Sequence, residues 1–264
     1  MKMAGEGGMD GAAEIINQAG DHRLIFVCDH ASNAVPPEHA SLGLPQAEFQ
    51  RHIAYDIGAA GVTREMATAF DAPAVIARWS RLLIDLNRGA DDPTLVMRIS
   101  DGAIIPGNAH VDDAEITRRI ARFHAPYHQA IAGLIATARA RNIAPVLVSI
   151  HSFTPEWKGT ARPWHYGILY DRDRRLSDGI FAVTRELPGI VVGDNAPYSG
   201  ELAGDTMNQH GTQNGLPHVL IEFRQDLVET PQQQREQGRF MARILRRALA
   251  ETKLAVFQGG FGDE

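Results

Sequence analysis

Short, uninterrupted apolar runs alternate along this chain with longer segments of helical periodicity, and this alternation constrains the fold more than any other feature. The clearest runs are residues 24–28 (LIFVC), 145–150 (PVLVSI) and 218–223 (HVLIEF). Runs of this length without polar interruption are typical of strands buried on both faces of a sheet. Strands that alternate with helices predict a single α/β domain with a mixed, mostly parallel sheet flanked by helices.

Weaker segments complete the predicted set of elements. Further strands are expected at residues 74–77, 82–86, 166–170 and 190–192, and helices at residues 46–70, 112–141, 175–187 and 230–252. Asp112 or Asp113 can cap the second of these helices, and Pro126 inside it should produce a kink. Thr230 and Gln233 have the spacing of a capping box at the start of the last helix.

The chain has 264 residues, enough to bury a sizeable core without disulfides or structural metals. We expect a flexible N-terminal extension at residues 1–20, one domain at residues 21–254 and a flexible tail at residues 255–264. The segment 193–215 is rich in glycine, asparagine and threonine and predicts a functional or mobile loop. The N-terminus lacks the apolar region of a signal peptide, and no apolar run is long enough to span a membrane.

Charge and cysteine content limit the partners and the compartment. The 26 basic and 32 acidic residues leave a net charge of −6, which does not favour a nucleic-acid partner. A local arginine cluster could still bind an acidic substrate. The single cysteine, Cys28, cannot form an intrachain disulfide, so we expect a reducing compartment and a cytoplasmic protein. Nothing in the sequence predicts the oligomeric state.

Polar side chains follow the three clearest apolar runs. His30 follows LIFVC, His151 follows PVLVSI, and Glu222 lies near the end of HVLIEF. Sites in open α/β sheets form at the carboxyl ends of the strands, so these side chains are expected to converge if the strands are neighbours. A fourth segment, RLLIDLNR, places Arg81 and Arg88 on either side of a short apolar run.

Each of these residues also has an ordinary structural explanation. His30 alone could be a loop histidine, His151 could bond to the backbone at the strand end, and Arg88 could be a surface arginine. Glu222 could pair with Arg224, although a carboxylate in so apolar a strand needs some partner. The conjunction favours a site, because each of these explanations would have to hold separately.

Other reactive residues are interpreted as structural. Cys28 closes an apolar strand, where cysteines are usually inert. The aspartate, histidine and serine within residues 29–32 lie too close in sequence for a serine triad, whose members come from separate elements. His124 and His128 share helical spacing across Pro126 and are interpreted as part of the helix.

Three segments resemble parts of zinc carboxypeptidases, in the same order. The string RLLIDLNRG resembles their VDLNR element, whose Asn-Arg pair binds the substrate carboxylate. VSIHSF resembles the strand end that supplies a zinc-binding histidine, and IEFRQD resembles the segment with the catalytic glutamate. The whole pattern is closer to the N-formylglutamate amidohydrolases, which share that metallo-exopeptidase-like fold. The resemblance extends from about residue 24 to residue 228, and its segments are DHASNAVP, RLLIDLNR, SIHS, NAPYSG and IEFR.

The resemblance implies a phosphorylase/hydrolase-like, zinc-dependent exopeptidase-like fold and a divalent metal, expected to be zinc. His30, His151 and one carboxylate would hold the ion. The carboxypeptidases have a glutamate three residues after their first ligand, but this chain has Asn33 there. We therefore expect Asp56, placed on the first predicted helix, as the third ligand. Asp29 is the next candidate carboxylate. His52, four residues before Asp56, is an alternative ligand.

The same resemblance assigns roles in hydrolysis of a small acidic N-acyl amino acid. Glu222 would be the general base, and Arg81 would stabilise the oxyanion. Asn87 and Arg88 would bind a substrate carboxylate. Three further residues are expected to contact substrate, with Arg224 or His210 binding a second carboxylate and Tyr198 closing over the site.

The predicted products are formate and L-glutamate from N-formyl-L-glutamate. One alternative is a zinc carboxypeptidase or a deacylase that acts on another acyl amino acid. A second alternative, of another class, is a non-catalytic binding protein with the same fold. The presence of both His151 and Glu222 argues against this last function.

Overall fold

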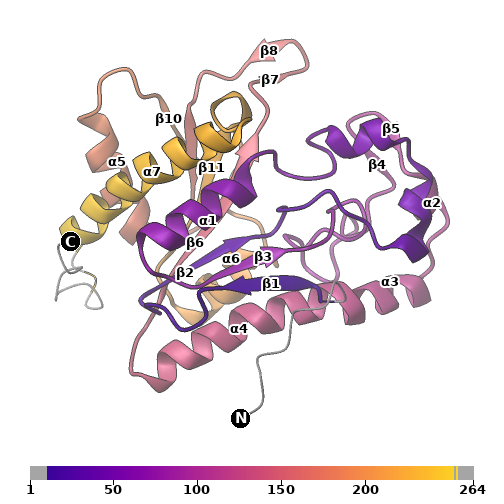
Figure 1. The fold of residues 1–264 in the computed structure, drawn as a ribbon, viewed down its shortest axis with the longest axis horizontal. Helices are drawn as coiled ribbons and strands as arrows, with labels where there is room; N and C mark the ends of the chain where they lie inside the picture. The colour runs from indigo at the N-terminus through magenta and orange to yellow at the C-terminus, as the bar shows by residue number, and fades with distance from the viewer. Residues whose placement is uncertain (1–10, 253, 255–264) are drawn as a thin grey trace.

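A seven-stranded sheet forms the centre of the computed structural model, which describes residues 11–252 and 254, and helices pack on both of its faces (Figure 1). The strand order is β1-β3-β2-β6-β11-β9-β10. The strands are β1 (Ala13–Ile16), β2 (Leu24–Cys28), β3 (Ala74–Ala77), β6 (Val146–Phe153), β9 (Tyr166–Leu169), β10 (Val192–Asp194) and β11 (His218–Arg224).

The central strands β3, β2, β6 and β11 run parallel to one another. At one side β1 pairs antiparallel with β3, and at the other β9 pairs antiparallel with β11 and parallel with β10. Every residue of β2 and β6 is buried, as expected for strands covered on both faces. The predicted mixed, mostly parallel α/β sheet is confirmed.

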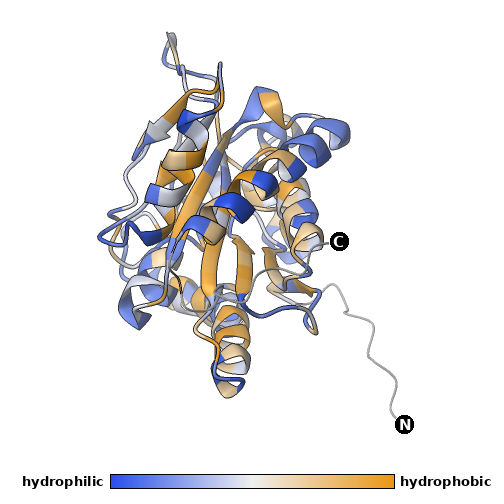
Figure 2. Cartoon of the chain, turned by 90° about the vertical axis from the view of Figure 1, so that its left-hand side faces the viewer, coloured by the Kyte–Doolittle hydropathy of each residue, from blue (hydrophilic) through white to orange (hydrophobic). Residues whose placement is uncertain are grey.

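Helices α1, α5 and α7 cover one face of the sheet, and α4 covers the other (Figure 1). Figure 2 shows the apolar strands enclosed between helices that are polar on their outer sides. The helices are α1 (Ala59–Ala69), α2 (Pro106–Ala109), α3 (Asp113–Arg119), α4 (Ala125–Ala140), α5 (Arg175–Arg185), α6 (Thr206–His210) and α7 (Pro231–Glu251). Across the described part of the chain, none is both long and apolar enough to cross a bilayer.

Small elements complete the fold around the sheet. Two short hairpins, β4–β5 and β7–β8, lie outside it. Their strands and the remaining helical turns are β4 (Ile99–Ser100), β5 (Ala103–Ile104), β7 (Glu156–Trp157), β8 (Thr160–Ala161), η1 (Pro37–Gly43), η2 (Gln46–Gln50), the π-helical η3 (Ile120–His124), η4 (Thr212–Asn214) and η5 (Gln225–Leu227).

The helix signals in the sequence are largely confirmed. Thr230 and Gln233 form the capping box of α7. Asp112 caps α3 by accepting a hydrogen bond from the backbone N–H of Glu115 at 2.8 Å. The long helix predicted over residues 112–141 is present as α3, the π-helical η3 and α4 in direct succession, and Pro126, which has no N–H to donate, lies just after the π-helical turn.

Two predicted elements are wrong. Residues 82–86 form turns rather than a strand, although their apolar side chains are buried, so here the apolar run reflects burial alone. The single helix predicted over residues 46–70 is instead the short turn η2 at Gln46–Gln50 and, after an irregular segment, α1. Gly58, immediately before α1, has a left-handed φ of 82°, and a Cβ there would lie 2.2 Å from the carbonyl oxygen of Val228.

The predicted flexible extension over residues 1–20 is also wrong for its second half. Residues Ala13–Ile16 form β1, which pairs with Ala74–Ala77 along the full length of both strands. Outside the sheet, Glu14 forms an ion pair with Arg64 at 2.6 Å. The buried edge of β3 needs backbone partners, and β1 supplies them. Residues 1–10 and the tail at 255–264 lie outside the described residues.

Candidate active site

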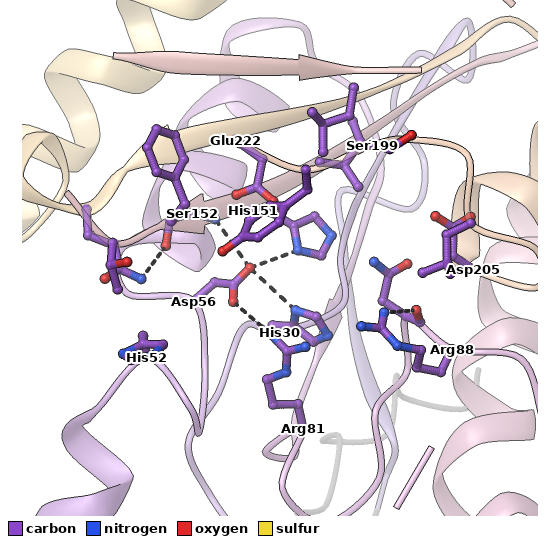
Figure 3. Close-up of a pocket in the computed structure, with 18 residues that line it drawn as sticks. His30, His52, Asp56, Arg81, Arg88, His151, Ser152, Ser199, Asp205 and Glu222 are labelled. Atoms are coloured by element: carbon purple, nitrogen blue, oxygen red, sulfur yellow. Dashed lines mark hydrogen bonds and ion pairs between the residues drawn. The ribbon is translucent and has the colours of Figure 1, made fainter. Parts of the chain in front are cut away.

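The predicted site residues converge at the carboxyl ends of β2, β6 and β11, which are adjacent in the sheet. His30 follows β2 by two residues, and His151 and Glu222 are register partners on β6 and β11. Asp56 reaches the same point from the turn before α1, where its backbone N–H donates to the carbonyl of His30 at 2.9 Å. These side chains line one cavity of about 250 Å³ (Figure 3).

His30, Asp56 and His151 form a compact group of potential metal ligands. One donor atom from each lies within 4.8 Å of the others, and all three residues are buried. Asp56 Oδ2 is 2.8 Å from His151 Nδ1 and 3.4 Å from His30 Nδ1. His30 Nδ1 is buried and has no hydrogen-bond partner among the described residues. The donor chemistry, two imidazoles and a carboxylate, suits a divalent transition metal.

Two further aspartates fix the orientation of the imidazoles. Asp85 Oδ1 lies 2.7 Å from His30 Nε2, and Asp29 Oδ2 lies 3.1 Å from His151 Nε2. A carboxylate behind each histidine sets the ring position and raises the basicity of the opposite nitrogen, as in many metal sites. The Nδ1 atoms of both rings are therefore directed towards Asp56.

The electrostatics of the cluster favour a bound cation. Burial alone would raise the pKa of Asp56, but His30 and His151 outweigh it and hold that pKa well below its usual value. Burial likewise opposes protonation of His151, yet its hydrogen bonds to Asp29 and Asp56 raise its pKa well above the ordinary value. A proton held in this way occupies a position that a metal ion could take.

Glu222 faces the same cluster but forms no ion pair with any residue in 11–252. Its Oε2 is buried without a hydrogen-bond partner in the part of the chain that the structure describes. Burial raises the pKa of its carboxyl to about 7, although His151 acts in the opposite direction. A carboxylate with this pKa can both accept and return a proton near neutral pH.

Close backbone packing brings the loop at residues 195–200 next to Glu222. Gly167 is the register partner of Glu222 on β9. A Cβ at Gly167 would lie 2.4 Å from the carbonyl oxygen of Ala196, so a side chain there would displace the loop. The loop carries Tyr198, which lines the cavity and is 46% exposed.

The arginines of the RLLIDLNR segment lie at different sides of the cavity (Figure 3). Arg81 Nη2 donates to Asp85 Oδ2 at 2.8 Å, and its Nη1 is 3.6 Å from Asp56 Oδ1. Arg88 lies on the side of Asp205, away from the ligand cluster, and its Nη1 donates to the carbonyl of Asn87 at 2.8 Å. Arg88 therefore extends the site towards a second binding region.

Asn87 and Arg88 are held by their backbone as well as by their side chains. Asn87 Oδ1 accepts from the backbone N–H of Thr206 at 3.1 Å, and the backbone N–H of Asn87 donates to Asp85 Oδ1 at 3.0 Å. Asp85 thus contacts His30, Arg81 and Asn87. This single carboxylate connects the ligand cluster to the Asn87–Arg88 region.

The structure does not bring two of the predicted substrate-binding residues, Arg224 and His210, to the lining of this cavity. Arg224 donates to Asp226 at 2.7 and 3.1 Å and to the carbonyls of Arg162 and Trp164. His210 points into the protein, and its Nε2 is 2.9 Å from His128 Nδ1. The guanidinium of Arg224 and the Nε2 of His210 therefore have partners away from this cavity.

The alternative ligands also lie away from the cluster. His52 lines the cavity, but its Nε2 is 3.5 Å from Asp101, and it is not part of the ligand group. Asn33 donates to the carbonyl of Phe49 at 2.7 Å and does not line the cavity. Asp56 was expected on a helix and instead occupies the turn before α1.

Sequence reasoning missed two carboxylates of the site. Asp85 has no role in the sequence interpretation, although its spacing from Arg81 in RLLIDLNR is a usable signal. Asp205 caps α6 and lines the cavity beside Arg88 (Figure 3), and burial raises its pKa to about 6. Asp29 was weighed as a ligand, whereas the structure places it behind His151.

Comparison with known proteins gives a family match over most of the chain. The family model described as N-formylglutamate amidohydrolase matches residues 22–229. No curated protein matches the chain.

Two solved structures are similar to this protein. The gene product Atu2144 from Agrobacterium tumefaciens is 34% identical with a TM-score of 0.88, and the match covers 92% of this chain and 96% of that chain. The N-formylglutamate amidohydrolase from Ralstonia eutropha JMP134 is 20% identical with a TM-score of 0.57, and the match covers 90% of this chain and 99% of that chain. The second similarity shows a shared fold.

Proposed function

This chain belongs to the N-formylglutamate amidohydrolase family, and we propose that it hydrolyses the amide of N-formyl or other small N-acyl amino acids in a metal-dependent reaction. One observation carries the proposal. A buried group of two imidazoles and a carboxylate shares a cavity with the guanidinium of Arg88 and with the carboxylate of Glu222, whose Oε2 has no hydrogen-bond partner among the described residues.

The residues present fit a divalent ion, for which we propose zinc. His30, Asp56 and His151 would hold it, and three protein ligands with one open position are the usual arrangement of catalytic zinc. When bound, the ion would polarise the scissile carbonyl and make water more acidic. Asp85 and Asp29 would keep the two imidazoles in orientation.

The chain's own residues would carry the proton transfers. Glu222 would accept the proton of the attacking water and return it to the leaving amine. Its pKa of about 7 and its unpaired, buried Oε2 support this role. Arg81 lies beside Asp56, and its fixed positive charge would stabilise the charge that develops on the carbonyl oxygen.

The substrate carboxylate would bind at Arg88 and Asn87. A guanidinium can donate to both oxygens of a carboxylate, which gives orientation as well as affinity. N-formyl-L-glutamate, with formate and L-glutamate as products, is the substrate that we propose to test first. Since Arg224 and His210 do not line the cavity, its second carboxylate would have to be met by other groups of the wall, of which Arg81 and His52 carry basic nitrogens.

Metal content and activity together test the proposal. Protein purified without added metal and without a metal-binding tag is expected to contain about one equivalent of divalent metal per chain, because the cavity holds one ligand group. A chelator should abolish hydrolysis, and added zinc should restore it. Less than about a tenth of an equivalent, with hydrolysis unaffected by the chelator, would exclude a metalloenzyme. A panel of N-formyl, N-acetyl and dipeptide substrates would separate deformylase, deacylase and carboxypeptidase activity.

Replacing Arg88 by lysine is expected to raise KM more than it lowers kcat. Lysine keeps the charge but loses the planar fork that binds a carboxylate at two points. An interaction that binds the substrate equally strongly in the ground state and in the transition state lowers KM, so its loss raises KM and leaves kcat nearly unchanged. Steady-state kinetics on N-formyl amino acids measures the effect, and Arg118→Lys on the exposed face of α3 is the control. Unchanged kinetics in Arg88→Lys would place Arg88 outside the substrate-binding site.

A further inference from the structure

Three buried histidines lie in contact behind the Asn87–Arg88 region, and the proposed reaction uses none of them. They are His124 and His128, from η3 and the first turn of α4, and His210, from the end of α6. The rings of His124 and His128 have centroids 4.3 Å apart, and those of His128 and His210 stack at 5.2 Å with an interplanar angle of 21°. Each residue is no more than 8% exposed.

Two of these histidines bond to the backbone on either side of Asn87. His124 Nε2 lies 2.9 Å from the carbonyl oxygen of Arg88, and His128 Nε2 lies 3.1 Å from that of Leu86. A carbonyl oxygen can only accept, so both Nε2 atoms carry the proton and donate. A neutral His128 then has an unprotonated Nδ1, which accepts from His210 Nε2–H at 2.9 Å.

The neutral state that these bonds require agrees with the surroundings. Burial, together with the neighbouring His124 and His210, lowers the pKa of His128 to about 3. Burial lowers the pKa of His210 to about 4, while Asp29 acts in the opposite direction. The protonation pattern is therefore fixed, and each of these bonds runs in one direction.

The backbone that receives these bonds has no regular structure of its own. Residues 82–88 form turns, so the carbonyls of Leu86 and Arg88 are not part of a helix or a strand ladder. Buried carbonyls need partners, and the histidines provide them. Thr206, at the start of α6, adds a bond from its hydroxyl to the Leu86 carbonyl at 3.3 Å and one from its N–H to Asn87.

We propose that His124, His128 and His210 are positioning residues that hold the Leu86–Arg88 backbone so that Asn87 and Arg88 face the substrate carboxylate. The inference rests on the proposed function. His124 and His128 act directly on the two carbonyls, and His210 acts through His128 by fixing which nitrogen of that ring donates. Displacement of a binding group by about an ångström can cost orders of magnitude in rate.

Two substitutions of His128 separate its two hydrogen bonds. Glutamine places an amide nitrogen near the position of Nε2, so His128→Gln can keep the bond to Leu86 and lose that to His210. Asparagine places its oxygen near the position of Nδ1, so His128→Asn can keep the bond to His210 and lose that to Leu86. The proposal predicts that asparagine is the damaging replacement and that glutamine largely rescues it.

The readout is the preference for a free α-carboxylate. The ratio of kcat/KM for N-formyl-L-glutamate to that for its α-amide measures how well Asn87 and Arg88 recognise the carboxylate. We expect His128→Asn to reduce this ratio by about tenfold or more, mainly through KM of the acid, with unchanged metal content. His128→Gln should stay within about threefold of the parent ratio. Both expectations reflect the loss or retention of one buried hydrogen bond to the segment.

His218 provides a matched control. It is buried, its Nδ1 lies 2.9 Å from the carbonyl oxygen of Leu216, and its Nε2, the nitrogen that asparagine does not replace, lies 3.2 Å from the hydroxyl of Thr212, but it does not line the cavity. His218→Asn should lower the thermal midpoint without changing the ratio. An unchanged ratio in His128→Asn, or an equal fall in His128→Asn and His218→Asn, would overturn the proposal. If His128→Asn does not fold, His124→Gln and His124→Ala make the same comparison at the Arg88 carbonyl.

A separate measurement distinguishes failure of this inference from failure of the proposed function. If the parent protein hydrolyses neither N-formyl-L-glutamate nor its α-amide, the proposed function fails. Calorimetric titration of the parent and the His128 variants with L-glutamate and its α-amide then tests positioning alone. Selective loss of L-glutamate binding in His128→Asn supports the inference, and equal binding to all variants, or no binding to the parent, overturns it.

Discussion

Glu222→Gln is expected to keep its metal and to lose turnover by on the order of 10²- to 10⁴-fold, the usual contribution of general-base catalysis. Glutamine has nearly the same shape as glutamate, but its amide cannot accept the proton of water. Among the residues that the structure describes, Glu222 belongs neither to the ligand group nor to an ion pair, so its replacement should leave the metal site intact. The loss should therefore appear in kcat.

The measurement combines kcat with metal per chain for the purified variant. Glu201→Gln is the matched control, because Glu201 is exposed in the loop beside the cavity. Near-parental turnover in Glu222→Gln would make Glu222 a structural residue. A pairing with Arg224 could not explain that result, since Arg224 is bonded to Asp226.

Asp56→Ala is expected to weaken zinc binding by at least about tenfold, because loss of a ligand should cost no less than loss of a group behind a ligand. The Oδ2 of Asp56 lies within 3.4 Å of the Nδ1 atoms of both His30 and His151. Without this carboxylate the cluster retains only two neutral donors. Asn33→Ala should leave zinc affinity nearly unchanged, because Asn33 bonds to the Phe49 carbonyl away from the cluster.

Zinc titration into the metal-free forms of both variants compares them directly. Circular dichroism should accompany the titration, because Asp56 also contacts Arg81 and the backbone of Ser152. If Asn33→Ala loses zinc and Asp56→Ala retains it, the metal lies nearer the His30 loop than the ligand group suggests.

The strands that the sequence predicts best are those buried on both faces. LIFVC has no polar residue, the only polar residues of HVLIEF are the buried His218 and Glu222, and both runs form central strands. Residues 82–86 show the same apolar character but fold as turns, since burial by surrounding loops produces the same pattern. The strand at Ala13–Ile16 lacks any strong local signal, because its stability comes from pairing with β3, about sixty residues away in sequence.

The site could be predicted where its residues follow the ends of neighbouring strands. His30, His151 and Glu222 meet for that reason. Arg224 and His210 illustrate the limit, because proximity along the chain does not determine the direction of a side chain. Arg224 lies two residues beyond Glu222, yet Asp226 holds it outside the cavity.

The Asp56 prediction shows a different limit. Asp56 belongs to the ligand group, as predicted, but it does not lie on a helix. A hydrogen bond from its backbone N–H to the carbonyl of His30 holds it in the segment before α1. The partner of that bond is 26 residues away in sequence, and no local pattern encodes it.

The two outermost strands of the sheet are short, with four residues in β1 and three in β10. An unpaired strand edge is a template on which another chain can add a strand, and short or charged edges limit such addition. Here β1 covers the apolar edge of β3 and carries Glu14, which is paired with Arg64. Within the described residues, both edges of the sheet are therefore short strands. They expose few unpaired backbone groups to which another chain could add a strand.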